Sequence, residues 1–552
     1  MSEPKKKYMG EMLIEKGLIT KKHIEYALQE QKITKEVLGE VLTEVGFVTE
    51  YDVAVTLADQ AKVPFHDLSD IFPETKLLKL FNKNLCLSNT FLPLQIKERE
   101  MEVATASIFH DKIGQIISRQ TGLKAKFYIS EKKKIINAIN GFYYFLENPV
   151  EKLIETEVNI LSQDREMARS LETLIKQILH FAVKMRATDI HIRPMSKSVN
   201  ISFRIDGVMT SMFSIPDSLK RIVASLKMKA DMDIAEQRLP QDGRFRETIL
   251  NNFYDFRVST LLSIHGENMV IRLLPMESSA QGMEQLGFFK EDVKIIENMF
   301  NEPFGIILLT GPTGSGKSTT LYAGIRSLNL LEKNVLTVED PIEYQIPLLR
   351  QTQVNEKAGY TFANATRYFL RHDPDVILVG EIRDKETAGT AVTASITGHL
   401  VLSTLHANSS VGAIPRLRDL GIRGYLIGDS LIGVVSQRLV RKICSRCKEA
   451  YAPEEWEKNY LNDNTISVLH RGTGCKVCNG TGYFGRTLVY EILTVDKELA
   501  GIIENERDME NIHEISKKKG FVDIFDITVK KIRQGITTTR EALRVLGNIT
   551  SQ

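Results

Sequence analysis

The stretch FGIILLTGPTGSGKSTTLYAGIRSL, residues 304–328, combines an apolar run, a glycine-rich loop and a helical pattern in that order. The apolar run is rich in β-branched residues, and the segment after the loop has helical periodicity. The loop matches the pattern Gly-x-x-x-x-Gly-Lys-Ser, with Gly311, Gly316, Lys317 and Ser318 at the defining positions. Strand, loop and helix in this order place a helix N-terminus against a bound phosphate. The sequence therefore predicts a nucleotide-binding site in an α/β domain.

Each residue type in this loop has a task in holding a nucleoside triphosphate. Backbone N–H groups of the glycine-rich turn surround a phosphate, Lys317 neutralises the β- and γ-phosphates, and the Ser318 hydroxyl ligates Mg²⁺. The predicted nucleotide-binding residues are the nine consecutive residues Gly311, Pro312, Thr313, Gly314, Ser315, Gly316, Lys317, Ser318 and Thr319. The loop does not identify the machine, because kinases, GTPases, helicases, transporters and secretion motors all use it.

Three further apolar runs of strand length follow the loop. They cover residues 335–340, 375–381 and 399–406, and helical segments separate them. This alternation predicts a parallel sheet that is covered by helices on both faces.

Two carboxylates and a histidine stand at the C-terminal ends of these strands, where open parallel sheets bind ligands. A hydrolytic site needs one carboxylate near Mg²⁺ and one that orients or deprotonates water. Glu339 and Glu381 are therefore the predicted catalytic carboxylates, although Gly380 occupies the position where the acid usually ends the strand. His406 is predicted to sense the γ-phosphate, whereas His399, at the other end of its strand, is predicted to be structural.

Residues 167–275 read as an α+β domain whose strands repeatedly carry arginine. The arginines are Arg204, Arg244, Arg257 and Arg272. Such residues can simply keep a surface soluble. Next to a phosphate-binding domain they could instead reach a γ-phosphate, because the guanidinium fork matches phosphate oxygens.

Four of the five cysteines form two Cys-x-x-Cys pairs with 27 residues between them: Cys444, Cys447, Cys475 and Cys478. Two such pairs offer four thiolates to one Zn²⁺ ion. Disulfides are disfavoured in a reducing compartment. A zinc site of this kind would be structural, because four thiolates leave no coordination position open for catalysis.

Composition narrows the function classes. The chain has 552 residues, which predicts three or four domains, and 72 Lys and Arg against 70 Asp and Glu give a net charge of +2. This near-neutral balance gives no reason to expect nucleic-acid binding. Because no apolar stretch reaches the length of a membrane span and the N-terminus lacks a signal-peptide core, we expect a cytoplasmic protein whose membrane association runs through partners.

An internal repeat lies at the N-terminus. Residues 9–31 recur at 38–60 with an offset of 29, and each copy reads as a short helix, a glycine stop, a threonine N-cap and a second helix. Residues 63–146 alternate strand-like and helical pieces, which predicts a small α/β unit. Residues 147–166 are charged and weakly periodic, which favours a linker.

Several motifs together resemble the type II secretion and type IV pilus assembly ATPases. The matching stretches are GPTGSGKSTT, TVEDPIEY, LRHDPDVILVGEIRDKETA and TGHLVLSTLHAN for the Walker A, Asp, Walker B and His boxes, with DIHIRP…FRIDGV…PQDGRF…RVST and CSRC…CKVC for the preceding domain and the tetracysteine loop. The resemblance covers residue 167 to the C-terminus. It implies a RecA-like P-loop motor domain preceded by an α+β, PAS-like domain.

The resemblance also implies how the site works. Arg257 and Arg272 from the preceding domain would reach ATP, together with Arg367, Arg371 and Arg383 of the motor domain, and Glu381 takes the Walker B glutamate position. The implied protein is a homohexameric ATPase, peripheral at the inner membrane, that acts on a platform protein and an associated cytoplasmic adaptor to assemble a pilus or a secretion pseudopilus. A retraction-type pilus motor and a nucleic-acid translocase are the alternatives.

The N-terminal repeat is similar to the paired motifs of the cyclic-di-GMP-binding, MshE-type domain that some of these ATPases carry. The frames are 8–31 and 37–60, and Tyr8 and Val37 stand where that family has arginine. The repeat therefore either binds cyclic-di-GMP as a regulator or docks to a partner. The expected domains are the MshE-type helical repeat (1–62), its α/β continuation (63–146), the linker (147–166), the PAS-like domain (167–280) and the RecA-like ATPase domain (281–552), with a zinc subdomain at about 441–486.

Overall fold

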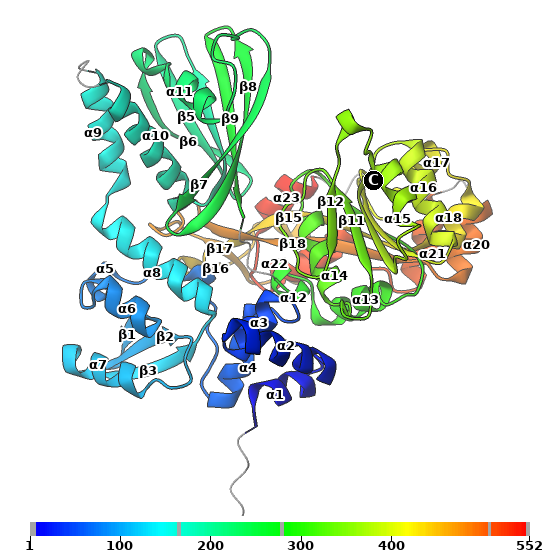
Figure 1. Cartoon of the computed structure of the whole chain (residues 1–552), viewed down its shortest axis with the longest axis horizontal. Coiled ribbons are helices and arrows are strands. Elements are labelled where there is room, and N and C mark those ends of the chain that lie inside the picture. The colour runs from blue at the N-terminus through cyan, green and yellow to red at the C-terminus, as the bar shows by residue number, and fades with distance from the viewer. Residues whose placement is uncertain (1–6, 163–166, 277–280, 506–508, 548–552) are drawn as a thin grey trace, which may run out of the picture. The chain divides into compact units, whose positions relative to one another are not determined.

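The computed structural model describes residues 7–162, 167–276, 281–505 and 509–547 (Figure 1). The chain divides into two compact units, one with Glu50–Ser279 and one with Gly10–Thr49 and Ala280–Gln552. Within the described ranges, no helix combines the length and the apolar character that crossing a membrane requires.

The N-terminal repeat folds as two helix pairs: α1 (Met9–Glu15), α2 (Lys21–Thr34), α3 (Leu38–Glu44) and α4 (Glu50–Ala61). The glycines predicted to end the first helix of each pair, Gly17 and Gly46, have positive φ angles of 72° and 87°, which glycine adopts without strain. Thr20 is the N-cap of α2, and α4 begins directly after Thr49. The predicted order of elements is confirmed in both copies. The boundary between compact units falls between α3 and α4 rather than at the end of the repeat.

A small α/β layer follows the repeat, as predicted. Its strands are β1 (Phe91–Lys97), β2 (Glu100–Thr105) and β3 (Lys124–Ile129), and its helices are α5 (Thr75–Leu78), α6 (Lys83–Asn89), α7 (Asp111–Thr121) and α8 (Lys132–Glu147). Strand β2 is central, with β1 antiparallel and β3 parallel to it. Phe91 and Met101 from the strands and Ile117 and Ile139 from the helices are fully buried together.

The expected linker is a helix instead. Residues Val150–Ser162 form α9, which packs beside α10 (Met167–Lys184), while the remaining residues 163–166 lie outside the described ranges. Val150, Ile154 and Leu161 recur on one face of α9 and are buried in the core of the following domain. Charged residues between them obscure this sparse apolar pattern in the sequence, and the prediction of a linker was therefore wrong.

The second domain is built on a six-stranded antiparallel sheet of order β6-β5-β4-β9-β8-β7. Its strands are β4 (Ala187–Pro194), β5 (Ser198–Ile205), β6 (Val208–Pro216), β7 (Gln241–Ile249), β8 (Asn252–Ser263) and β9 (Gly266–Pro275). Helices α9, α10 and α11 (Ile222–Lys229) share a core with one face of the sheet, to which Ile190 and Ile271 contribute. Because side chains alternate along a strand, Asp189 and Arg272 belong to the opposite face.

The motor domain has a seven-stranded sheet of order β12-β11-β13-β14-β10-β15-β18. The strands are β10 (Gly305–Thr310), β11 (Val335–Glu339), β12 (Arg350–Gln353), β13 (Val376–Ile382), β14 (Leu400–Leu405), β15 (Leu431–Ile443) and β18 (Tyr483–Thr494). All neighbours are parallel except β15 and β18. The four predicted strands are confirmed, and the sequence reading missed β12, β15 and β18.

Helices cover both faces of this sheet, as predicted. They are α12 (Met283–Leu286), α13 (Lys290–Phe300), α14 (Lys317–Arg326), α15 (Phe362–Phe369), α16 (Lys385–Ile396), α17 (Ala413–Asp419), α18 (Gly424–Ser430), α20 (Lys497–Asn505), α21 (Met509–Lys518), α22 (Ile524–Arg533) and α23 (Thr539–Leu546). Helix α19 (Glu455–Tyr460) instead packs in a small separate core with Leu469, Ile532 and Ala542. Ile306 and Leu308 of β10 enter one core, and Ile307 and Leu309 enter the other. Burial on both sides explains why β10 reads as a continuous apolar run.

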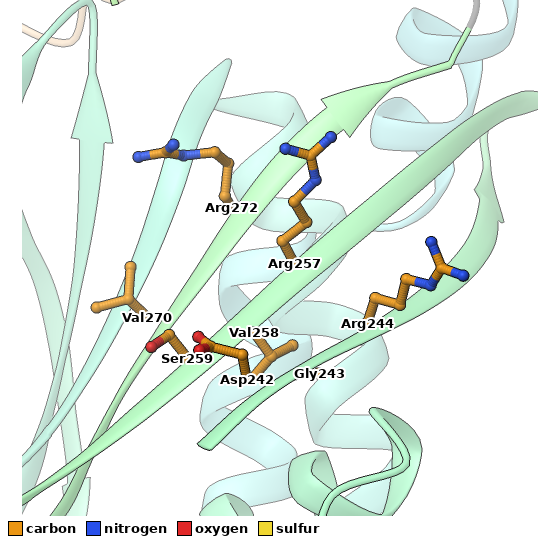
Figure 2. Close-up of a pocket in the computed structure, with 8 residues that line it drawn as sticks. All are labelled: Asp242, Gly243, Arg244, Arg257, Val258, Ser259, Val270 and Arg272. Carbon is orange, nitrogen blue, oxygen red and sulfur yellow. The ribbon is translucent and has the colours of Figure 1, made fainter. Parts of the chain in front are cut away.

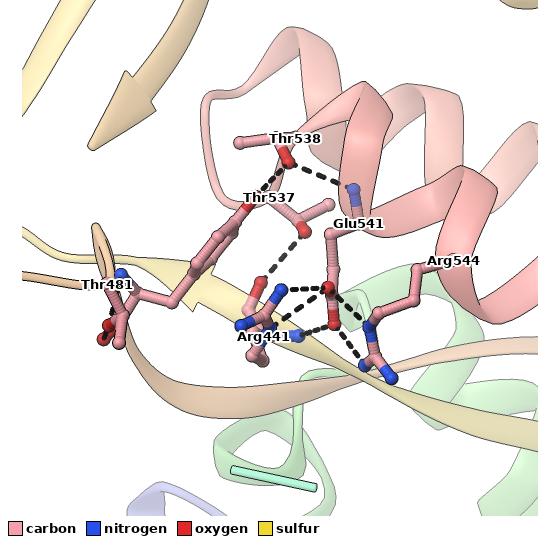
Figure 3. A network of polar contacts seen from close by, with 7 residues as sticks. Arg441, Thr481, Thr537, Thr538, Glu541 and Arg544 are labelled. Carbon is pink, nitrogen blue, oxygen red and sulfur yellow. Dashed lines mark hydrogen bonds and ion pairs between the residues drawn. The ribbon is translucent and has the colours of Figure 1, made fainter. Parts of the chain in front are cut away.

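The last helix, α23, is fixed to β15 by a buried carboxylate (Figure 3). Glu541 is fully buried, and its two oxygens accept hydrogen bonds from the side chains of Arg441 and Arg544 and from the backbone N–H of Arg441, at 2.6–3.0 Å. The hydroxyls of Tyr483 and Thr538 are 2.6 Å apart, and the guanidinium of Arg441 lies 4.0 Å from the centre of the Tyr483 ring. These contacts hold the C-terminal helix against the ribbon that carries the cysteines.

Candidate functional site

The phosphate loop joins β10 to α14 and has the backbone that the motif requires. Gly311, Gly314 and Gly316 have φ angles of 133°, 77° and 90°, which L-residues with a side chain rarely adopt. A Cβ atom on Gly311 would lie 2.3 Å from the backbone oxygen of Gln437, so only glycine fits there. Gly316 is the N-cap of α14, whose first-turn N–H groups favour an anion.

The nine predicted nucleotide-binding residues do not all present their side chains. Five are exposed: Pro312, Thr313, Gly314, Ser318 and Thr319. Ser315 is buried and its backbone N–H donates to the carbonyl oxygen of Pro312, so its hydroxyl is not open to a nucleotide. The Ser318 hydroxyl stands in the first turn of α14, where it could ligate Mg²⁺ next to bound phosphates.

Lys317 lies over the loop. Its Nζ donates hydrogen bonds to the carbonyl oxygens of Gly311 and Pro312, at 2.9 and 3.1 Å. Burial lowers the pKa of Lys317, and the nearby charge of Glu381 acts in the opposite direction. Lys317 and Glu381 therefore belong to one electrostatic site.

An irregularity in β13 determines the position of Glu381. The pairing register of β13 with β14 shifts between Val379 and Ile382, so the two residues between them are displaced from the regular alternation. This shift explains how an acid one position later than usual can serve the site. Glu381 forms an ion pair with Arg383, and its Oε2 lies 3.6 Å from Nε2 of His406.

The two histidines of the fourth predicted strand differ, as the sequence predicts. His406 is exposed and lies beside Glu381 at the C-terminal end of the strand. The ring Nδ1 of His399 lies 2.9 Å from the carbonyl oxygen of Ala394, which marks a structural role. Of these two histidines, His406 is the more exposed.

Glu339, the other candidate carboxylate, sits in a buried hydrogen-bond network. Its side chain accepts hydrogen bonds from the hydroxyls of Tyr322 and Thr337 and, at 3.1 Å, from Nε2 of Gln351. Only 5% of Glu339 is exposed. Neutral donors occupy both oxygens of Glu339, whereas Glu381 has charged or titratable partners and its side chain is 15% exposed.

The arginines of the second domain form a row across its sheet. Arg244, Arg257, Arg272, Asp189 and Arg204 are opposite one another on consecutive strands β7, β8, β9, β4 and β5. Figure 2 shows three of the arginines side by side on neighbouring strands. They line a cavity of about 640 Å³ together with Asp242 and Ser259 among others.

Acidic neighbours hold these arginines only partly. Arg272 pairs with the buried Asp189 at 3.0 Å, and Arg257 lies 3.7 Å from Asp255. The side chain of Arg272 is still 54% exposed and that of Arg257 34% exposed. The row can therefore bind an anionic group that enters the cavity. The sequence identified the arginines but not their common register, nor Asp189.

The four paired cysteines converge as predicted. Their Sγ atoms all lie within 4.8 Å of one another, and the contacting pairs are 3.7–3.8 Å apart. A tetrahedral zinc site with bonds of about 2.3 Å separates its sulfurs by roughly 3.8 Å, so the cluster fits Zn²⁺. Burial raises the pKa of Cys478, but N–H groups of Cys475 and Gly482 outweigh it and lower the pKa to about 7. That thiol is therefore close to the thiolate form that zinc requires.

Comparison with known proteins identifies the family. The family model described as type II/IV secretion system protein matches residues 164–544. The chain belongs to this family. A second model, the MshEN domain, matches residues 61–148.

Individual relatives agree with this assignment. The chain is 42% identical over 440 residues to the type II secretion system ATPase E of Vibrio cholerae, a match that covers 79% of this chain and 85% of that protein. It is 39% identical over 466 residues to the type IV pilus assembly ATPase PilB of Thermus thermophilus, which covers 83% of this chain but 50% of the relative. The solved structure of the Yersinia pseudotuberculosis ATPase DotB matches 68% of this chain and 93% of its own with 18% identity and a TM-score of 0.50, which shows the shared fold.

Membership of the secretion ATPase family identifies the reaction that this chain catalyses. The motor domain is a RecA-like P-loop domain, and the chain is an ATP hydrolase. Lys317 lies over the phosphate loop, and Glu381 and His406 lie beside each other at the C-terminal ends of their strands. The sequence-based recognition of a secretion or pilus assembly ATPase with an MshE-type N-terminal domain is confirmed.

Three supporting residues escaped the sequence reading. Tyr322 holds Glu339, Gln437 contacts the phosphate loop and Glu491 holds the segment after His406. Each acts through a neighbour that is distant in sequence, so no local motif could reveal it. The one available signal was position, because Tyr322 follows Ser318 by one helical turn.

Proposed function

We propose that this chain is a cytoplasmic, homohexameric motor that hydrolyses ATP to assemble pilin-like subunits through an inner-membrane platform protein and its cytoplasmic adaptor. The observation that carries the proposal is the complete phosphate loop of the motor domain, and a row of exposed and partly exposed arginines in the preceding domain supports it. A site that is split between units can couple hydrolysis to their relative movement. Peripheral membrane association would then come from the partners.

In this proposal, Glu381 orients and deprotonates the attacking water. It lies beside His406, which would report on the γ-phosphate, and within the electrostatic reach of Lys317. Arg383 would hold Glu381 until ATP binds and then turn toward the phosphates, because it is exposed and pairs only through a flexible side chain. Mg²⁺, ligated by Ser318, would neutralise charge on the β- and γ-phosphates.

Arg257 and Arg272 would complete the site by reaching the γ-phosphate when the two units close. Arginine suits this task because its fork bridges two phosphate oxygens and stays charged. Asp189 would hold Arg272 in the open state through the 3.0 Å ion pair. Arg367 of the motor domain, which pairs with Glu386 at 2.8 Å, and Arg371 would serve the same site.

Zn²⁺ would bind the four cysteines and have a structural role. The cluster lies between the end of β15 and the start of β18, so the ion would tie together the two strands of one antiparallel ribbon. A metal in this position stabilises the subdomain at about 441–486 and takes no part in hydrolysis.

The N-terminal region would provide regulation. The MshEN match at residues 61–148 supports a cyclic-di-GMP-binding domain, whereas the exposed Tyr8 and Val37 replace the arginines expected in the repeat. Calorimetric titration of the full chain with cyclic-di-GMP decides between dinucleotide binding and docking of a partner.

The proposed motor is tested by the ATPase rate of the full chain with three additions: vesicles that carry the platform protein, vesicles alone, and single-stranded DNA. Platform vesicles should raise the rate several-fold, and the other two should not. Stimulation by DNA alone would instead support a translocase. Depolymerisation of pili on overproduction of the chain would support a retraction motor.

A further inference from the structure

Strands β15 and β18 connect the cysteine cluster to the centre of the motor sheet. Strand β15 ends at Ile443, directly before Cys444, and β18 begins at Tyr483, shortly after Cys478. The two strands pair from Ile443 and Tyr483 to Gly433 and Thr494. At its other end β15 pairs with β10, the strand that leads into the phosphate loop.

Strands β10, β15 and β18 pair side by side where β10 leads into the phosphate loop. Thr310, the last residue of β10, is opposite Ser436 of β15, and Ser436 is opposite Glu491 of β18. The side chain after Ser436, Gln437, is fully buried. Two of these sheet residues, Gln437 and Glu491, have side chains that contact segments outside the sheet.

Gln437 supports the phosphate loop. Its Nε2 donates a hydrogen bond of 2.9 Å to the carbonyl oxygen of Ser315, and it lies 3.3 Å from the position that a Cβ of Gly316 would take. Among the described residues, neither Oε1 of Gln437 nor Oγ of Ser315 has a hydrogen-bond partner, although both are buried. A buried unpaired oxygen costs stability. An apolar side chain at position 437 would avoid this cost. We therefore attribute the amide to its hydrogen bond with the phosphate loop and not to packing of the core.

Glu491 supports the segment that follows His406. Its Oε1 accepts hydrogen bonds from the backbone N–H and the hydroxyl of Ser410, at 2.6 and 2.8 Å. Its Oε2 accepts the N–H of Ile524 at the start of α22, at 3.2 Å. Ser410 is fully buried and Glu491 is 5% exposed. One carboxylate thus fixes a turn four residues from His406.

We propose that Gln437 and Glu491 are positioning residues of the hydrolytic site. Gln437 sets the path of the phosphate loop, and Glu491 sets the place of His406. The inference rests on the proposed function, since it takes ATP as the ligand of the loop and His406 as the neighbour of its γ-phosphate.

The two residues should affect different steps. The phosphate loop binds ATP before and during reaction, so loss of the Gln437 contact weakens binding. His406 acts on the γ-phosphate, so loss of the Glu491 contact slows turnover and leaves binding intact. Interactions that are made mainly in the transition state lower kcat, whereas uniform binding interactions change KM.

The test compares five full-length proteins: the unaltered chain, Gln437→Leu, Glu491→Met, Glu491→Gln and the control Tyr490→Phe. Tyr490 is the residue opposite Gln437 and is also buried, but its hydroxyl bonds Asp292 and the N–H of Phe289, away from both loops. The Tyr490→Phe variant therefore removes a buried hydrogen bond from the same pair of strands, β15 and β18, and leaves the proposed hydrolytic site unchanged. Steady-state kcat and KM, the Kd for a fluorescent ATP analogue and Tm are measured for each protein.

For Gln437→Leu we expect KM and Kd to rise about tenfold, the equivalent of one buried hydrogen bond, with kcat within threefold and Tm no lower than in the control. For Glu491→Met we expect kcat to fall about tenfold with Kd within threefold. Glu491→Gln keeps Oε1 as an acceptor for Ser410 and should recover most of the rate.

In a chain that hydrolyses ATP, kinetics of Gln437→Leu and Glu491→Met that match those of Tyr490→Phe would overturn the inference alone. An unaltered chain that binds no ATP would contradict the proposed function and the inference together. If Glu491→Met fails to fold, Glu491→Gln decides: a twofold to threefold loss of kcat with unchanged Kd supports the inference, and an unchanged kcat overturns it.

Discussion

The phosphate loop and the arginine row differ in how firmly they are held. Lys317 is bonded to two carbonyls of its own loop, and the loop passes so close to β15 that Gly311 has no room for a Cβ atom. Arg257 and Arg272 instead project into a cavity of about 640 Å³ with partial acidic support. The comparison teaches that the phosphate loop is preformed in the motor domain, whereas Arg257 and Arg272 stay partly exposed beside their acidic neighbours.

Removal of the loop lysine should have the largest effect. Lys317→Ala deletes the ammonium that lies over the phosphate loop, so we expect ATP binding to be lost at concentrations that saturate the unaltered chain. Equilibrium binding of a fluorescent ATP analogue measures this loss. Retention of normal affinity would mean that the loop backbone alone binds the nucleotide.

Exchange of Glu381, the proposed catalytic carboxylate, should separate ATP binding from hydrolysis. Glu381→Gln keeps the shape but removes the charge, so we expect ATP to bind while turnover falls by about 10² or more. Glu339→Gln is the matched comparison, because Glu339 is buried among neutral donors. A larger rate loss in Glu339→Gln than in Glu381→Gln would reverse their roles.

Loss of one cysteine should affect stability and not the site. Cys475→Ser leaves three thiols, so the purified chain should drop from about one zinc per chain to much less, and the C-terminal subdomain should melt earlier. ATP affinity should stay within a few-fold. If protein prepared without chelator contains no zinc, the four cysteines do not form a zinc site and serve only in packing.

Acid should weaken the anchor of α23 by a smaller amount. Burial raises the pKa of Glu541, but hydrogen bonds from Arg544 and Arg441 outweigh it, and the net pKa is below the ordinary value of 4.5. A lowered carboxyl pKa stabilises the fold above the unfolded pKa, and this contribution is lost as the pH falls through the folded pKa. Thermal melts between pH 6 and pH 3 should therefore show a steeper loss of stability in the unaltered chain than in Glu541→Gln. Equal slopes would contradict the account of this network.

Contiguous motifs made much of this site readable in advance. The phosphate loop, the strand-end Glu381 and each Cys-x-x-Cys pair are short contiguous motifs, although the two cysteine pairs, with 27 residues between them, meet only in the folded chain. Strands β10 and β13 were equally readable, because burial on both faces leaves an unbroken apolar run.

Features that depend on register or on long-range contacts could not be read. The alignment of Arg244, Arg257 and Arg272 needs the pairing of three strands, which the sequence does not state. Strand β15 was missed because Arg438 and Arg441 interrupt its apolar pattern, and both are used for contacts with the C-terminal region. Helix α9 was missed for the related reason that its buried face is narrow.

The most direct test of a site shared between two units is the single-turnover rate of ATP hydrolysis by the double variant Arg257→Ala, Arg272→Ala. The control is Arg246→Ala, an exposed arginine of the same sheet that pairs with Asp255 at 3.5 Å. The rate of the double variant should fall at least about tenfold while ATP affinity stays within threefold, as for arginine fingers generally, and the control should be unchanged. The specific activity of the unaltered chain should also fall on dilution, because the proposed ring must assemble. Normal turnover in the double variant, with activity independent of concentration, would confine hydrolysis to the motor domain and contradict the account.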